Sequence, residues 1–241
     1  MKTSIVTLLF CCSVLISQSA PRPRHLFIFA GENNMESLKP ERTVIPPLVD
    51  LDKDLKKVDL LWMRMARRTM AMHDVDSDWT DSDGNEKASY GSGYSKTQAK
   101  EYERLLETAR DTARKKECDT IVLFWMQGES DAQKGWGDQY AASFQRFVKQ
   151  LEADMELGKL DVVLVRLSDH GLQEKWQKKY PDWAKVRAAQ EKLVHANKGW
   201  ILIDTDDLNG KQNKLQFDKK GIETLGERYA EAALKLVGAV N

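Results

Sequence analysis

The sequence is poor in cysteine, with three in 241 residues. Cys11 and Cys12 lie in an apolar stretch near the amino terminus, and only Cys118 lies in the rest of the chain. If that stretch is removed, no disulfide can form within the chain. No spacing of cysteine and histidine is typical of a zinc site. We therefore expect a domain held together by its core alone, with no metal and no cofactor.

The sequence also lacks an excess of charge of either sign. Lysine and arginine number 37, aspartate and glutamate number 37, and the formal net charge is +0. A chain of this kind has no basic field for nucleic acid and no polybasic patch for a membrane surface. The composition therefore favours a neutral or polar partner.

Long apolar runs are missing as well. The run over residues 5–16 has about 12 residues, fewer than the roughly 20 that span a bilayer. Lys2 precedes this run, and Ser17-Gln18-Ser19 follows it with the small-x-small pattern of a cleavage site. Residues 1–19 are interpreted as a secretory signal peptide, which predicts a secreted or periplasmic protein. The alternative is a buried first strand.

Short apolar runs predict buried strands at residues 26–30, 120–125, 162–167 and 200–203, with a weaker fifth at residues 58–62. They are nearly continuous rather than alternating, which is typical of a parallel sheet covered on both faces. Apolar residues recur at helical spacing in residues 102–113, 140–155, 183–194 and 222–236. Alternating strands and helices predict an α/β fold, a three-layer α/β/α sandwich with a central, mostly parallel sheet. Residues 20–241 are expected to form one domain.

The segment Gly-Glu-Asn-Asn-Met at residues 31–35 follows the first predicted strand. Hydrolases with an open α/β sheet place an attacking hydroxyl at such a position. Asn33 and Asn34 carry amides, which cannot attack an ester. The segment is therefore interpreted as a nucleophile turn without a nucleophile. The alternative is that the two asparagines cap a helix.

Three motifs together resemble the sialate O-acetylesterase-like carbohydrate esterases of the SGNH (GDSL-like) hydrolase superfamily. Residues 31–35 resemble the Gly-Gln-Ser-Asn-Met block of that family. Residues 125–132, Trp-Met-Gln-Gly-Glu-Ser-Asp-Ala, match its Trp-x-Gln-Gly-Glu-Ser-Asp block. Residues 217–230 resemble its last helix, which follows an Asp-x-x-His block. The resemblance runs from about residue 25 to 235 and implies the flavodoxin-like SGNH fold.

Enzymes of this family remove acetyl groups from sugars with a serine, a histidine and a carboxylate. Carried over position by position, the serine becomes Asn33, the aspartate Asn213 and the histidine Gln216. The glycine that donates to the oxyanion should fall near residues 64–69, where the chain has Ala66-Arg67-Arg68. The resemblance therefore implies that no catalytic residue is intact. Arg67 or Arg68 at that place would favour an anionic sugar.

Two functions remain open, and both take carbohydrate or an acetylated sugar as the partner. The first is a pseudo-hydrolase that binds carbohydrate without cleaving it. Its predicted substrate-binding residues are Asn33, Asn34, Gln127, Gly128, Glu129, Asp131 and Gln216.

The second function is an active carbohydrate O-acetylesterase with a rewired site. His170 follows a predicted strand at the carboxyl edge of the sheet, where sites form, and is the candidate substitute base. Ser130 is the alternative nucleophile, with Glu129 as its orienter. A purely structural or interaction protein is a further possibility.

Residues 74–94 are rich in aspartate and predict a long, solvated acidic loop. Asp74, Asp76 and Asp78 begin like a calcium-binding EF-hand. However, Trp79 stands at the required glycine position, and Asn85 stands where the loop needs its glutamate. We therefore expect no calcium site in this loop.

Overall fold

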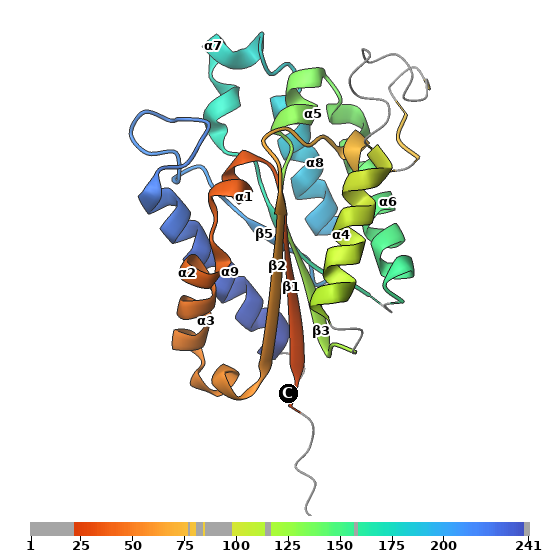
Figure 1. Cartoon of the computed structure of the whole chain (residues 1–241). Coiled ribbons are helices and arrows are strands. Elements are labelled where there is room, and N and C mark those ends of the chain that lie inside the picture. Colours follow the sequence, from red (N-terminus) through yellow and green to blue (C-terminus); the bar gives the residue numbers. More distant parts are fainter. Residues whose placement is uncertain are drawn as a thin grey trace, which may run out of the picture.

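The computed structural model describes residues 22–76, 78–80, 84, 98–113, 117–156 and 159–238. These residues form three layers, with a five-stranded sheet between two layers of helices (Figure 1). The strands are β1 (Arg24–Gly31), β2 (Asp59–Ala66), β3 (Thr120–Met126), β4 (Asp161–Val165) and β5 (Ile201–Ile203). Their order is β2-β1-β3-β4-β5, and every neighbouring pair is parallel. The predicted fold class is confirmed. The signal peptide expected at residues 1–19 lies outside the described residues.

Helices cover both faces of the sheet (Figure 1). On one face lie α2 (Pro40–Thr43), α3 (Ile45–Leu51) and α9 (Lys219–Val237). On the other lie α4 (Gln98–Thr112), α6 (Gly137–Asp154) and α8 (Trp183–Ala196). Three short helices, α1 (Asn33–Ser37), α5 (Glu129–Lys134) and α7 (Glu174–Gln177), lie at the carboxyl edge of the sheet. The short turns are η1 (Lys53–Lys57), η2 (Met72–Asp74) and η4 (Asp169–Leu172).

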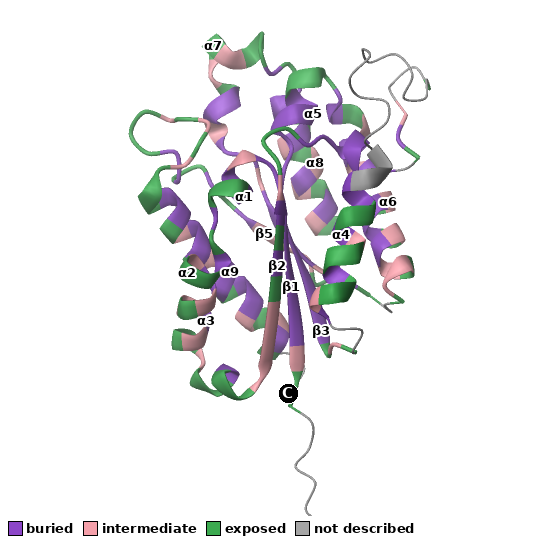
Figure 2. Ribbon diagram, in the orientation of Figure 1, coloured by how far each residue is buried: buried purple, intermediate pink, exposed green. Residues whose placement is uncertain are grey.

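The central strands are buried on both faces, as Figure 2 shows by their colour. In β1, Leu26 and Ile28 belong to the core under α4, α6 and α8, whereas Phe27 and Phe29 belong to the core under α9. All four side chains have no exposed surface. This double covering explains why the strands are nearly continuous apolar runs in the sequence. Within the described residues, no helix is long and apolar enough to cross a membrane.

The prediction of a solvated loop over residues 74–94 is wrong at its start. Asp74 and Asp76 are buried, with 6% and 2% of their surface exposed. The Asp74 carboxylate accepts a hydrogen bond from the Ala71 N–H at 2.9 Å. Asp76 pairs with Arg146 of α6 at 2.6 Å. These aspartates therefore anchor the segment to the core, while residues 77, 81–83 and 85–94 lie outside the described residues.

The packing of α9 on α2 yields a stability prediction. A side chain at Gly226 would overlap the carbonyl group of Thr43, the last residue of α2. Gly226→Ala should therefore lower the free energy of unfolding by about 1–3 kcal/mol, the usual cost of overpacking. Gly238→Ala is the matched control, because a side chain there meets no atom within 4 Å. Urea denaturation followed by tryptophan fluorescence measures both, and equal stability of the two variants would refute the packing account.

Candidate functional site

The strand β1 turns sharply into α1 at the carboxyl edge of the sheet. Gly31 has a φ of +156°, and a side chain there would overlap the Met126 carbonyl of β3. The next residue, Glu32, donates its N–H to that same carbonyl at 2.8 Å. This close approach fixes Asn33 as the first residue of α1, directly after the turn. The sequence placed the nucleophile position at such a strand-to-helix turn, and the turn is there.

Asn34 joins this turn to the loop that precedes α9. Its Nδ2 donates to the Leu215 carbonyl at 3.1 Å, and its Oδ1 accepts from the Phe217 N–H at 2.9 Å. Gln216 lies between these two bonded residues and is exposed. The positions that the resemblance assigns to the serine and the histidine therefore lie on segments held together side by side. Helix capping by Asn34 is not observed, because its side chain binds this loop.

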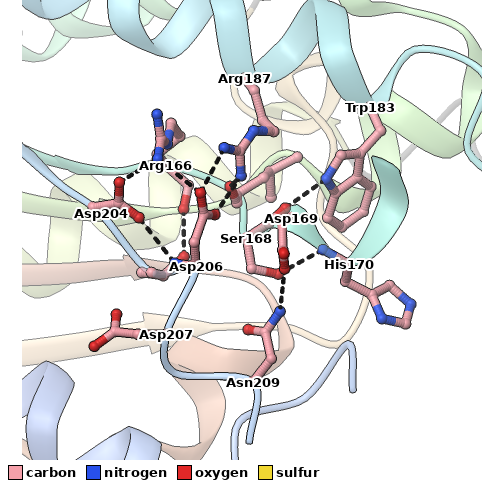
Figure 3. Close-up of polar contacts among 12 residues, drawn as sticks. Arg166, Ser168, Asp169, His170, Trp183, Arg187, Asp204, Asp206, Asp207 and Asn209 are labelled. Atoms are coloured by element: carbon pink, nitrogen blue, oxygen red, sulfur yellow. Dashed lines mark hydrogen bonds and ion pairs between the residues drawn. The ribbon is translucent and has the colours of Figure 1, made fainter. Parts of the chain in front are cut away.

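Asn213 is turned away from this pair. Its Nδ2 donates to Asp169 at 2.9 Å, and its Oδ1 accepts from Asn209 at 2.7 Å. Asn209 also donates to the same Asp169 oxygen at 3.1 Å (Figure 3). Among the described residues, no hydrogen bond joins the side chains of Asn213 and Gln216. The Asn213 side chain therefore faces Asp169, and the grouping of Asn33, Asn213 and Gln216 at one site stays a prediction.

His170 lies at the carboxyl edge of the sheet, as expected, but it is enclosed. Only 5% of its surface is exposed. Its ring nitrogen Nδ1 lies 2.6 Å from the main-chain oxygen of Asn213, which makes Nδ1 a donor. The ring centroids of Trp176 and Trp183 lie 5.1 Å and 6.1 Å from that of His170. The ring points away from Asp169 (Figure 3). His170 thus supports the loop through Asn213.

A buried polar network lies beneath the turn. Gln127 donates from Nε2 to Glu32 at 3.0 Å, to the Met70 carbonyl at 2.7 Å and to Asp131 at 2.5 Å. Asp131 also accepts the Met72 N–H at 3.1 Å. The network thus ties β1, the segment after β2 and the start of α5 to one another.

Most of the predicted binding block therefore faces the interior. Gln127 and Asp131 have no exposed surface, and Gly128 is buried against α8. These three residues have no surface in this structure that a ligand could contact, because their side chains or main chain pack within the fold. Glu129, 6% exposed, lies next to the turn and lines the small cavity together with Asn34.

Glu32 is a functional candidate that the sequence reasoning did not select. It is 1% exposed, and its Oε1 accepts the Ser130 N–H at 3.2 Å. Burial, followed by the nearby charges of Glu129 and Asp131, raises its pKa well above the usual range. Burial also raises the pKa of Glu129 and of Asp131, each to about 7. The available signal was a glutamate at the place of glutamine in the Gly-Gln-Ser-Asn-Met block.

Arg67 is engaged within the fold through both its main chain and its side chain. Its main-chain N–H donates to the Gly31 carbonyl at 3.1 Å. Its guanidinium pairs with Glu101 of α4 at 2.7 Å. Arg68 is largely exposed and lies 4.0 Å from Glu36. Each arginine therefore has an acidic partner in the fold, and a role in holding an anionic sugar stays a prediction.

The cavity beside the turn is small. Its volume is about 10 Å³, close to the minimum for one water molecule. It is lined at the strand ends and the turn by residues including Asn34, Glu129, Ser168, Trp183, Leu215 and Phe217. A sugar ring cannot enter this cavity as it stands.

Comparisons with known proteins agree on family and fold. The family model described as carbohydrate esterase, sialic acid-specific acetylesterase, matches residues 84–235. This range contains the block at residues 125–132 and the positions of Asn213 and Gln216, but not the turn at residues 31–35. Comparison with curated protein sequences gives no match.

Solved structures resemble the chain over most of its length. A protein from Arabidopsis thaliana is 20% identical, with a TM-score of 0.60 over 88% of this chain and 98% of that one. The carbohydrate acetylesterase XAC1771 of Xanthomonas citri is 14% identical, with a TM-score of 0.59 over 89% of this chain and 57% of that one. NanS is 12% identical, with a TM-score of 0.59 over 91% of this chain and 99% of that one. At such identities the likeness shows the fold.

The buried acids predict how stability depends on pH. Their raised pKa values mean that the folded chain holds more protons than the unfolded chain between about pH 4 and 7. Stability supplied by these groups is therefore lost as the pH rises through that window. Glu32→Gln removes one charge and keeps the shape and the acceptor oxygen. It should raise the free energy of unfolding at pH 8 by about 1–2 kcal/mol, the size of a typical single substitution.

The gain should shrink towards pH 4.5, because Glu32 is then neutral in the folded chain and about half neutral in the unfolded one. Glu41→Gln on exposed α2 is the control and should change little at either pH. Urea denaturation from pH 4.5 to 8 measures both variants. A lower free energy of unfolding for Glu32→Gln than for the parent at pH 8 would contradict the claim that burial and the charges of Glu129 and Asp131 destabilise the Glu32 carboxylate.

Proposed function

We propose that this chain, which belongs to the carbohydrate esterase family of sialic acid-specific acetylesterases, is a carbohydrate-binding pseudo-hydrolase that does not cleave its ligand. The observation that carries the proposal is that Asn33 and Gln216, which both bear amides, stand on two segments that the side chain of Asn34 joins. Asn33 stands first in α1, and Asn34 holds the loop on both sides of Gln216. The segments that carry these two positions are held side by side, and neither Asn33 nor Gln216 carries a group that can do the chemistry.

The chemistry of the two amides supports this proposal. The Asn33 amide has no hydroxyl that could form an acyl-enzyme. The Gln216 amide does not titrate near neutral pH, so it cannot take and return a proton. In subtilisin, loss of the serine or the histidine costs on the order of 10⁶ in rate. Both amides can still donate and accept hydrogen bonds, which suits sugar hydroxyl or acetyl groups.

An active esterase with a rewired site is the alternative, and the geometry favours it less. Ser130 is 6% exposed and lies in the first turn of α5. His170 is occupied by the Asn213 carbonyl, and no hydrogen bond between His170 and Ser130 exists among the described residues. A nucleophile and base for this alternative would need to be brought together by a rearrangement.

The proposal also includes export of the protein from the cytoplasm. The charged start, the short apolar run and the small-x-small site at residues 1–19 support a signal peptide, and hence a secreted or periplasmic protein. Glycans lie in those compartments, so the expected ligand is accessible there.

Hydrolysis and binding measured on the same samples test the proposal. Acetylated sugars and 4-nitrophenyl acetate should show no turnover above that of the variants Ser130→Ala and His170→Asn, while isothermal titration with glycans gives saturable binding. The first variant removes the nucleophile and the second removes the base that a rewired site would use. Turnover in the parent chain that falls at least about tenfold in either variant would establish the active esterase instead.

A further inference from the structure

A large groove lies on the far side of Gln216 from the turn. It has a volume of about 830 Å³ and is formed by the loop from Asp207 to Asp218 and by the first residues of α9. Ligand sites commonly have volumes of about 300–1,000 Å³. The groove is therefore large enough for part of a glycan chain, whereas the cavity beside the turn has room for one water molecule.

Three lysines give this groove a positive character. Lys211, Lys214 and Lys220 line it, and all three are exposed. Within the part of the chain that the structure describes, none of them forms an ion pair. They differ in this from Lys53, Lys57 and Lys185, which pair with aspartates. Three unpaired ammonium groups along one groove attract negative charge.

The two acids of the groove are already engaged. Asp207 is held by Arg228 through two hydrogen bonds of 2.8 Å and 2.6 Å, and this bonding lowers the pKa of Asp207. Asp218 caps α9 by accepting the Gly221 N–H at 2.9 Å. Neither carboxylate pairs with the groove lysines, so the local charge available to a ligand is positive.

The remaining lining is polar and offers no stacking surface. Gln212, Gln216 and Thr224 supply donors and acceptors, and no aromatic residue is among the described residues that line the groove. Neutral sugars are commonly held by aromatic rings that pack on their apolar faces. Without such a ring, recognition must rest on charge and hydrogen bonds, which favours an acidic glycan.

The loop that forms the groove is fixed in place from several sides. Asn209, 4% exposed, donates to Asp169 below it (Figure 3). Asn213 donates to the same carboxylate, and Asn34 holds the residues that flank Gln216. A loop held in this way loses little conformational freedom on binding, so its groups are positioned in advance for a ligand.

We infer that this groove binds a polyanionic oligosaccharide, with Lys211, Lys214 and Lys220 contacting its carboxylate or sulfate groups and Gln216 at the end nearest the turn. The inference rests on the proposed carbohydrate-binding function and adds the location and the charge of the ligand. A nucleic acid is disfavoured, because the whole chain has a net charge of +0 and no extended basic field.

The test compares two triple variants of the full chain. Lys211→Gln with Lys214→Gln and Lys220→Gln removes the groove charges. Lys56→Gln with Lys192→Gln and Lys235→Gln removes three exposed lysines elsewhere and is the matched control. Isothermal titration uses oligogalacturonate, a heparin oligosaccharide, a neutral xylo-oligosaccharide and a single-stranded DNA oligonucleotide, at 50 and 200 mM salt.

The parent should bind at least one of the two acidic glycans, more weakly at the higher salt. The groove variant should lose about tenfold in affinity, because it removes three ammonium groups that would contact the anionic ligand. The control variant should lose little. Binding of oligogalacturonate alone assigns the charge to carboxylates, and binding of heparin alone assigns it to sulfates.

Several results would overturn the inference. Equal losses in the two variants, or equal affinity for the DNA and the acidic glycans, would show unspecific charge attraction. Binding of the neutral glycan alone, unchanged in the groove variant, would refute the groove while leaving the carbohydrate-binding function standing. No binding of any glycan would refute both. Circular dichroism of both variants checks that they fold, since all six lysines are exposed.

Discussion

The side chain of Asn34 is the contact on which the proposed site depends. It bonds residues 181 and 183 positions away, on both sides of Gln216. The turn after β1 and the loop before α9 would otherwise be separate surface segments. Because one amide satisfies a carbonyl and an N–H of that loop, hydrogen bonds hold the segment around Gln216 against the turn that carries Asn33. The groove on the other side of the loop takes its position from the same contact.

The polar network below the turn supports the fold and contains buried carboxyl groups with raised pKa values. Glu32, Glu129 and Asp131 are buried within one network around Gln127. Carboxylates in such a place repel each other and lack water, so protonation is favoured over charge. This explains why the segment with the strongest family resemblance, residues 125–132, contributes so little exposed surface here. Its role in this chain is to hold the turn in place.

The sequence was sufficient for the fold but not for the direction of single side chains. Strands and helices were predictable because the covering of both sheet faces leaves a continuous apolar run, and each helix leaves an apolar stripe. The assignment of Asn33 and Gln216 to catalytic positions rests on the family resemblance and stays a prediction. The burial of Asp74 and Asp76 was missed because their partners, Ala71 and Arg146, are not marked in the sequence. For the same reason the turn of Asn213 towards Asp169 could not be foreseen.

The central claim is that Asn33 and Gln216 occupy the places of a nucleophile and its base. The most direct measurement is acetyl-ester turnover by the double variant Asn33→Ser with Gln216→His. Asn213 is left unchanged, because an aspartate there would face Asp169, which now accepts from Asn213 at 2.9 Å. The account predicts turnover at least about tenfold above that of either single variant, since serine and histidine act as a unit. A folded double variant no faster than the single ones would contradict it.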